Sequence, residues 1–433
     1  MKKSANIVLT ELMPNYKRKV REMKKIKVAV VAAGSRSSIY SGHMATFKDE
    51  AEIFAIAEPI DRLRNKFKEK HGISDENTFK TYDEMFAKGK IADAVIIGTQ
   101  DNMHFDPCMK AMDAGYKYIL IEKPISPSME ECVTLYKTAK EKGVNIQVCH
   151  SLRYAPFYRK LKEIIDSGVI GEIVTINHTE GVGEAHQSHS FVRGDWRNSK
   201  ECCPMILAKC CHDADLMLYL TGKDCHELSS YGSTYLFKKE NAPEGSTDRC
   251  IEDCKVKDTC PYNCFKVYTE NEWMRGVAVD KKGYDDLYKA MAENQYGRCV
   301  YRCDNDVVDH QVVNFLLDDG VTAHLTMTAF QNGRVTNIGG TMGRIHAEFE
   351  KQKIVVTDFR DPQGAEIEYM VGTNTSGHGG ADYCMARDFI KTVRGETDGY
   401  TNIAISLQSH AMCHAAEKSR LENRNVKIDE FLK

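Results

Sequence analysis

Four titratable residues stand where they could move protons or stabilise negative charge. Lys209, His212 and Asp215 are three residues apart, so they share one stripe if residues 209–220 form the expected helix. Lys123 follows an apolar run, at the strand end where open parallel sheets bind ligands. An imidazole titrates near neutral pH and an ammonium stabilises a developing oxyanion. We therefore expect Lys123, His212 and Lys209 to be catalytic.

A second candidate site is the turn after the apolar run 27–33. Dinucleotide-binding turns carry G-x-G-x-x-G, which lets the backbone approach a pyrophosphate at a helix N-terminus. This chain has Ala32, Gly34 and Ser37 at those three positions. One glycine of three is a weak match, but the small side chains keep the approach open, and Ser35 and Ser37 add hydrogen-bond donors.

Glu58 strengthens the interpretation of this turn as a nucleotide site. It ends the next apolar run, 24 residues after Gly34. A carboxylate there binds both ribose hydroxyls and repels a 2′-phosphate, which favours NAD over NADP. Arg36 and Arg62 lie nearby and keep NADP as the alternative.

Sixteen cysteines are many for a chain that we expect to be cytoplasmic, where disulfides are rare. Six of them lie between residues 250 and 303, inside a polar insert at about 238–305 that looks too polar for a core of its own. Four close thiolates can hold zinc in a structural site, although their C-x3-C spacing is not that of zinc ribbons. We expect a structural zinc ion with four ligands, and reduced thiols or a disulfide as the alternatives: Cys250, Cys254, Cys260 and Cys264.

The pattern between residues 26 and 150 predicts the elements that position these groups. Short apolar runs alternate with amphipathic segments, which indicates right-handed βαβ units and a doubly wound parallel sheet. The runs that read as buried strands are 27–33, 52–58, 94–98, 118–122 and 145–149.

Residues 151–433 predict a different architecture, an α+β domain with a large open, mixed or antiparallel sheet. Segments 310–317 and 321–329 flank Asp318-Asp319-Gly320, a hairpin signature. Helices at 381–394 and 403–421 are expected to close the domain. Residues 1–25 are polar and basic, and we interpret them as an N-terminal arm.

The composition of the 433-residue chain excludes several function classes. A formal charge of −3 offers no positive field for nucleic acid. No apolar run approaches the ~20 residues of a membrane helix, and Met1-Lys2-Lys3 is not followed by the apolar stretch of a secretory signal. We expect a cytoplasmic protein that binds neither nucleic acid nor membranes.

Two further motifs make a resemblance specific. Gly98-Thr99-Gln100-Asp101-Asn102-Met103-His104 follows one predicted strand, and Glu122-Lys123-Pro124 follows the next. With the βαβ pattern, they make the chain similar to the Gfo/Idh/MocA family of nicotinamide-dependent oxidoreductases from Lys27 to about Leu421. The resemblance implies a Rossmann domain, a sheet-containing second domain, and oxidation or reduction of a sugar or cyclitol hydroxyl by a homodimer or homotetramer.

The resemblance also assigns roles to individual residues. It implies that Lys123 contacts both the nicotinamide ribose and the substrate, and that His212 moves the proton. The expected cofactor contacts are Gly34, Ser35, Arg36, Ser37, Glu58, Thr99, Asn102, His104, Glu122 and Lys123.

One departure from the family pattern puts the proton relay in doubt. The family usually has an Asp four residues before the histidine, whereas this chain has Ala208. The polar stretch 186–197 reads as a loop whose aromatic and bidentate groups suit a carbohydrate. The side chains expected to bind substrate are Arg153, Tyr154, Glu180, Arg193, Trp196, Asp215 and His378.

Three functions are compatible with these residues. The first is a dehydrogenase of a sugar, cyclitol or glycoside hydroxyl. The second is a glycoside hydrolase that oxidises its substrate transiently with bound NAD, eliminates the aglycone and reduces the product. The third is a non-enzymatic sensor with a degenerate nucleotide domain, which the intact Lys123 and His212 disfavour.

Overall fold

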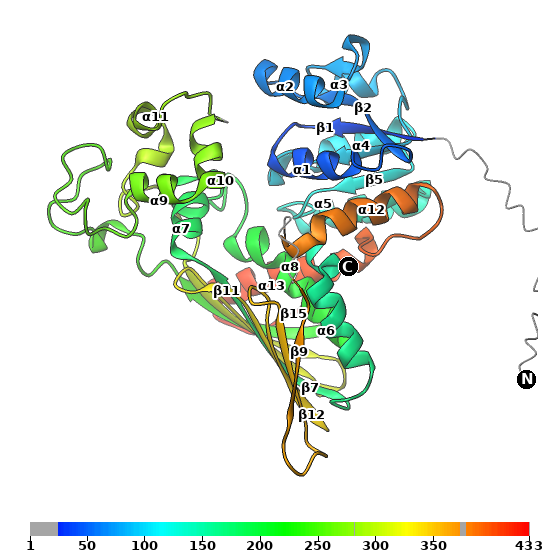
Figure 1. Cartoon of the computed structure of the whole chain (residues 1–433), viewed down its shortest axis with the longest axis vertical. Coiled ribbons are helices and arrows are strands. Elements are labelled where there is room, and N and C mark those ends of the chain that lie inside the picture. The colour runs from blue at the N-terminus through cyan, green and yellow to red at the C-terminus, as the bar shows by residue number, and fades with distance from the viewer. Residues whose placement is uncertain (1–24, 281, 373–377, 433) are drawn as a thin grey trace, which may run out of the picture.

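A computed structural model describes residues 25–280, 282–372 and 378–432 (Figure 1). The expected N-terminal arm, except Lys25, lies outside the described residues. Within the described part of the chain, none of the helices combines the length and apolarity that a bilayer span requires.

The first domain is a doubly wound α/β unit around a six-stranded parallel sheet, as predicted. Its strand order, β3-β2-β1-β4-β5-β6, reverses between β1 and β4, the point at which such sheets bind nucleotides. The strands are β1 (Ile26–Val31), β2 (Ala51–Ala57), β3 (Thr78–Phe79), β4 (Ala94–Ile97), β5 (Tyr118–Ile121) and β6 (Asn145–Val148). The helices are α1 (Ser35–Met44), α2 (Asp61–His71), α3 (Tyr82–Phe86), α4 (Phe105–Asp113) and α5 (Met129–Lys142).

The second domain is built on a nine-stranded mixed sheet of order β14-β13-β12-β11-β7-β10-β9-β8-β15. Only β7 and β10 pair in parallel among its described strands. The strands are β7 (Ile173–Val182), β8 (Cys225–Ser233), β9 (His310–Leu317), β10 (Thr322–Thr328), β11 (Asn332–Gly340), β12 (Gly343–Glu348), β13 (Lys353–Asp358), β14 (Glu366–Met370) and β15 (Val426–Lys427).

Three helices of the second domain lie between this sheet and the nucleotide domain: α6 (Pro156–Asp166), α8 (Met205–Thr221) and α13 (Ile403–Glu422) (Figure 1). Helix α8 packs against β7 and β10 and is buried along nearly all its length. Its sequence is rich in Leu, Met and Ala, which favour helices, and it ends at Gly222 in the left-handed region (φ 67°). Helix α12 (Ala381–Val393) returns to pack on α1.

The cysteine-rich insert forms a lobe beside the large sheet (Figure 1). It carries α9 (Cys264–Glu270), α10 (Glu272–Arg275) and α11 (Leu287–Glu293). The expectation that it lacks a core was wrong, because a small apolar cluster packs between these helices: Val267, Tyr268, Met274, Ala290, Met291 and Tyr296.

Candidate active site

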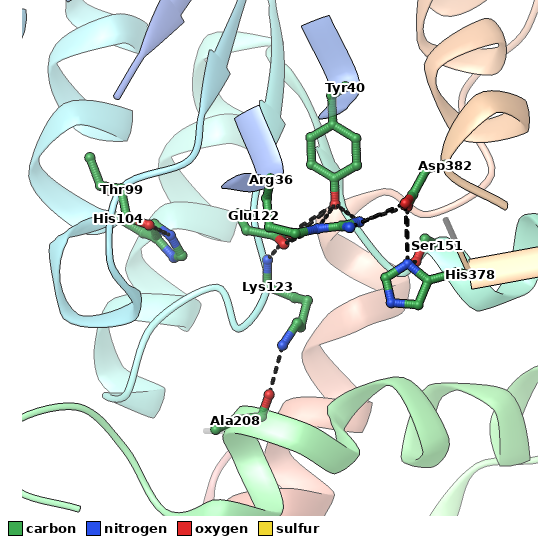
Figure 2. A network of polar contacts seen from close by, with 10 residues as sticks. All are labelled: Arg36, Tyr40, Thr99, His104, Glu122, Lys123, Ser151, Ala208, His378 and Asp382. Carbon is green, nitrogen blue, oxygen red and sulfur yellow. Dashed lines mark hydrogen bonds and ion pairs between the residues drawn. The ribbon is translucent and has the colours of Figure 1, made fainter. Parts of the chain in front are cut away.

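Lys123 bridges the two domains. It follows β5, and its Nζ donates a hydrogen bond to the Ala208 carbonyl oxygen of α8 at 2.7 Å (Figure 2). Burial opposes the charge of this ammonium, but the neighbouring Cys211 and Glu122 side chains raise its pKa above the usual value. Lys123 is therefore a cation at neutral pH, placed to stabilise negative charge on a ligand at the domain junction.

His212 lies on the same helix, buried at this junction. Its ring centroid is 5.7 Å from that of His150 and 5.9 Å from that of His378. Burial, followed by the charges of Lys123 and His150, lowers the pKa of His212 well below its usual value. Its Nδ1 has no hydrogen-bond partner among the described residues. The imidazole is thus neutral at pH 7 and can accept a proton.

Arg36 ties the nucleotide turn to the far end of the chain. Its guanidinium pairs with Asp382 of α12 (Nη2–Oδ1 2.6 Å) and with Glu122 (Nε–Oε1 3.1 Å), and it also contacts the Tyr40 hydroxyl. His378 Nδ1 lies 3.2 Å from the same Asp382 carboxylate (Figure 2). The expected cofactor contact Arg36 is therefore held by protein carboxylates, and His378 lies in one polar network with Glu122.

Glu58 is positioned by backbone groups at the end of β2. Its Oε2 accepts a hydrogen bond from the Ala33 N–H at 2.8 Å, and its Oε1 accepts one from the Ile60 N–H at 2.9 Å. The carboxylate therefore lies against the turn that contains Gly34. This is the position from which the sequence predicts ribose recognition.

Two residues of the turn replace fingerprint glycines in different ways. Ala32 adopts a positive φ of 71°, the conformation that glycine ordinarily takes there. Ser37 packs against Gly98, where an added Cβ would come within 2.1 Å of Ser37 Oγ. Gly98, directly after β4, therefore leaves the space that lets Ser37 of α1 pack closely. Ser35 is exposed at the start of α1.

Three residues in and after the loop that follows β4 make hydrogen bonds to protein carbonyl oxygens. Thr99 Oγ1 donates to the Met103 carbonyl at 2.9 Å, and Asn102 Nδ2 donates to the Glu201 carbonyl at 2.9 Å. His104 is 0% exposed, and its ring nitrogens lie 2.7 Å from the Pro124 oxygen and 3.2 Å from the Thr99 oxygen. The ring of His104 therefore holds two loops together from inside, and the contact between His104 and the cofactor stays a prediction.

Arg153, Tyr154 and Asp215 do not form the expected open pocket. Arg153 and Asp215 make a buried bidentate ion pair (2.5 and 2.8 Å). The Tyr154 hydroxyl is buried between Asp388 at 2.9 Å and Gln147 at 2.5 Å. Protein partners therefore occupy the polar groups of these three side chains, and their contact with a substrate stays a prediction.

Lys209 lies one turn before His212 on α8, and its partner is a carboxylate of β7. Its Nζ is 3.1 Å from Glu180 Oε1, and Glu180 also pairs with Arg334 at 2.7 Å. Arg334 in turn contacts Asp213 at 2.8 Å. The positive charge of Lys209 is therefore neutralised by a buried carboxylate.

Residues 184–193 are helical, so the predicted loop at 186–197 was wrong over most of its length. Trp196 donates through Nε1 to Asp101 at 2.9 Å. Arg193 is 0% exposed and donates to the carbonyl oxygens of Arg298 (2.7 Å) and Tyr262 (2.6 Å). This side chain therefore fastens the insert to the domain, and substrate binding by Arg193 stays a prediction.

All sixteen cysteines are free thiols. Cys250, Cys254 and Cys260 line one small cavity with Cys299, whereas Cys264 is absent from its lining. The guanidinium of Arg193 borders the same cavity, 3.9 Å from Cys250 Sγ. Among the described residues, the insert thiols form no group of three ligand atoms that all lie within 4.8 Å of one another. The thiols lie around one cavity without the close spacing of an assembled metal site.

The sequence predicts no role for Tyr40, Asp213, Arg334 or Asp382. Each acts through a partner more than eighty residues away: Tyr40 through Glu122, Asp213 and Arg334 through one another, and Asp382 through Arg36. Of these four, only Asp382 could have been found from the sequence, because it follows Gly379-Gly380 at the start of a predicted helix.

A doubly wound nucleotide domain joined to a nine-stranded sheet, with a lysine and a histidine at the junction, defines a nucleotide-dependent oxidoreductase. Residues 26–150 match the family described as "Oxidoreductase family, NAD-binding Rossmann fold", and residues 162–428 match its "C-terminal alpha/beta domain". The chain belongs to the Gfo/Idh/MocA family, which confirms the resemblance seen in the sequence.

Known proteins of this kind resemble the chain at low identity. The putative oxidoreductase YteT of Bacillus subtilis is 24% identical over 71% of this chain and 74% of its own length. The 2,7-anhydro-N-acetylneuraminate hydratase of Escherichia coli is 31% identical, but the match spans 32% of this chain and about a third (36%) of the hydratase. The solved structure of levoglucosan dehydrogenase with NADH and levoglucosan has a TM-score of 0.70 at 18% identity, covering 94% of this chain and 100% of that one. That likeness establishes the fold.

Proposed function

We propose that this chain transfers a hydride between a nicotinamide and a hydroxyl-bearing carbon of a sugar, cyclitol or glycoside. The observation that carries the proposal is the pairing of a cationic Lys123 with a neutral His212 at the junction of the two domains. The relatives named as acting on levoglucosan and on an anhydro-sugar support a carbohydrate substrate.

The two side chains divide the chemistry between them. His212 accepts the proton of the substrate hydroxyl, because its imidazole is neutral at physiological pH. The Lys123 ammonium stabilises the alkoxide that develops on the same oxygen. NAD, when bound, supplies the hydride acceptor. Glu122 and Asp382 hold Arg36 and His378 around this point and thereby fix its geometry.

NAD is the proposed cofactor rather than NADP. The small residues Gly34 and Ser37 leave the turn open to a pyrophosphate, with Gly98 accommodating Ser37 from behind. Glu58, fixed by two backbone N–H groups, supports recognition of an unmodified ribose and repulsion of a 2′-phosphate.

One relative favours a redox-neutral second candidate. The hydratase from Escherichia coli is named for the addition of water rather than for net oxidation. The same Lys123 and His212 pair serves a glycoside hydrolase that oxidises its substrate transiently, eliminates the aglycone and returns the hydride. A sensor without turnover is the third candidate.

We also propose a structural zinc ion in the insert. Its thiols fit in part, because three of the four expected ligands line a cavity of about 20 Å³, large enough for a single ion-sized occupant. Cys299 replaces Cys264 as the fourth thiol of that lining. Elemental analysis should find one zinc ion fewer per chain in C260S than in the wild type; equal zinc content in the two proteins contradicts the assignment.

Two expectations about the cellular state accompany this proposal. The sixteen free thiols suit a reducing compartment such as the cytoplasm. Exposed apolar side chains on the large sheet suit a second copy of this chain, as in a homodimer or homotetramer. They include Val174, Tyr231, Leu316 and Ile367.

The test is turnover of the purified protein against sugars, cyclitols and aryl glycosides. Steady NADH formation with NAD and a free sugar or cyclitol identifies a dehydrogenase. Aglycone release with tightly bound NAD and no net NADH identifies the redox-neutral hydrolase. Absence of both signals in a protein that binds NAD overturns the enzymatic proposal in favour of a sensor.

A further inference from the structure

Three buried ligand-type side chains meet where the two domains join. Asp101 lies in the loop after β4, whereas Cys202 and Cys203 precede α8 in the second domain. One carboxylate oxygen and the two Sγ atoms all lie within 4.8 Å of one another. Among the described residues, this is the one group of three His, Cys, Asp or Glu side chains with such spacing.

The two oxygen–sulfur distances match a tetrahedral zinc site. Asp101 Oδ2 lies 3.5 Å from Cys202 Sγ and 3.5 Å from Cys203 Sγ. Zinc binds sulfur at about 2.3 Å and carboxylate oxygen at about 2.0 Å, so a tetrahedral angle places oxygen and sulfur about 3.5 Å apart. In the metal-free protein the same spacing is occupied by S–H···O hydrogen bonds.

The surroundings hold the three groups in place. Trp196 Nε1 donates to Asp101 Oδ2 at 2.9 Å, the kind of outer contact that orients a metal-binding carboxylate. Asn102 Nδ2 donates to the Glu201 carbonyl, which aligns the two segments directly beside the three groups. No domain movement is therefore needed to bring them together.

The charge balance also favours a divalent cation. Two thiolates and one carboxylate carry three negative charges, so a bound Zn²⁺ leaves one negative charge. Asp101 and Cys203 are near enough to Lys123 to affect its protonation. Binding releases the two thiol protons to solvent, and no oxidation or reduction takes place.

We propose that Asp101, Cys202 and Cys203 bind one zinc ion that joins the loop after β4 to the segment preceding α8. Three protein ligands leave the fourth tetrahedral position to a water or a ligand oxygen. The inference does not depend on the reaction proposed above, since it concerns only ion binding.

The experiment compares the full-length protein with C202S/C203S, D101N and a control, C384S, which alters a half-buried thiol on α12. Each protein is reduced, loaded with ZnCl2 and desalted, and its zinc is measured by elemental analysis. We expect C202S/C203S to hold one zinc ion fewer per chain than the wild type, D101N to bind it at least tenfold more weakly, and C384S to match the wild type. Zinc held by the insert is present in all four proteins, so it does not affect the difference in zinc content between them.

A second readout keeps the test independent of folding defects in the variants. Peptide mass spectrometry of the wild type after brief iodoacetamide treatment should show Cys202 and Cys203 protected by zinc and not by MgCl2. Equal zinc content in wild type and C202S/C203S, or equal alkylation with and without zinc, overturns the proposal. Isolation of a Cys202–Cys203 disulfide from the zinc-loaded protein also overturns it.

Discussion

Two lysines at α8 have different partners. Lys123 reaches α8 from the nucleotide domain and donates to a neutral carbonyl, that of Ala208. Lys209 belongs to α8 itself and faces the Glu180 carboxylate, which Arg334 also binds. Both are cations, but only the charge of Lys123 is left without a directly paired carboxylate on its Nζ among the described contacts.

The difference in partners distinguishes the Lys123 charge, which is available to a ligand, from the Lys209 charge, which stabilises the fold. A cation paired with a buried carboxylate attracts a developing oxyanion only weakly, because the oxyanion interacts with both charges and their effects largely cancel. A cation that contacts a carbonyl keeps its net charge. The sequence predicts a catalytic role for both lysines. Their partners, a carbonyl oxygen for Lys123 and a carboxylate for Lys209, distinguish the two.

Exchange of each lysine for methionine tests this comparison most strongly. We expect K123M to lower kcat by about 10³-fold or more with NAD affinity within threefold of wild type, because it removes oxyanion stabilisation. We expect K209M to lower kcat by less than about tenfold, because that charge is already neutralised. Steady-state kinetics and calorimetric NAD titration measure both effects.

The arginine variant K123R controls for lost charge alone, since it keeps the cation but changes its shape. Comparable losses of kcat in K123M and K209M would contradict the distinction between the two lysines.

Removal of the carboxylate tests the structural half of the comparison. In E180Q, Lys209 and Arg334 lose a buried anionic partner, and we expect the free energy of unfolding to fall by about 3 kcal/mol. E184Q, an exposed neighbour on the same segment, should change it by less than about 0.5 kcal/mol. Denaturant unfolding measures both variants. A wild-type stability in E180Q would mean that Lys209 is not held by this pair.

The pH dependence of stability sharpens the comparison, because Lys123 and not Lys209 is among the charges that depress the pKa of His212. The folded protein keeps this imidazole neutral, whereas the unfolded chain protonates it near pH 6.5. Stability is therefore full above about pH 6.5 and is lost as pH falls below it.

We expect H212N to lose that part of the pH dependence, measured as the difference in unfolding free energy between pH 7 and pH 5. K209M should keep it. An H212N profile that is superimposable on the wild-type profile would show that folding does not lower the pKa of His212.

The smallest expected effect concerns the cofactor rather than the helix. E58Q removes the negative charge at the nucleotide turn while keeping an acceptor for the Ala33 N–H. We expect the preference of kcat/KM for NAD over NADP to fall by about tenfold, roughly 1.4 kcal/mol. An unchanged preference would assign cofactor choice to other residues of the turn.

The sequence predicted the fold well because its signals are local. Apolar runs identified the five longer parallel strands, and Asp318-Asp319-Gly320 identified the hairpin, whose Asp319 and Gly320 have the positive φ values that such a turn requires (57° and 77°). The helix at residues 184–193 was missed because its polar composition resembles a loop.

A site residue was predictable from the sequence only where its position along a strand or helix determines where it lies in the fold. Lys123 follows a strand and His212 lies on a buried helix, so both reach the domain junction by topology. For Arg193 and Tyr154 the partner decides the role, and Tyr262 and Asp388 are distant in sequence. No spacing rule reveals such pairs.

The link between Arg36 and Asp382 spans 346 residues. During synthesis, the nucleotide domain leaves the ribosome long before Asp382 is made. Arg36 must wait for nearly the whole chain before that carboxylate can hold it. The nucleotide site is therefore finished only near the end of translation. A nascent chain that stops before α12 leaves Arg36 with Glu122 and Tyr40 but without the Asp382 carboxylate.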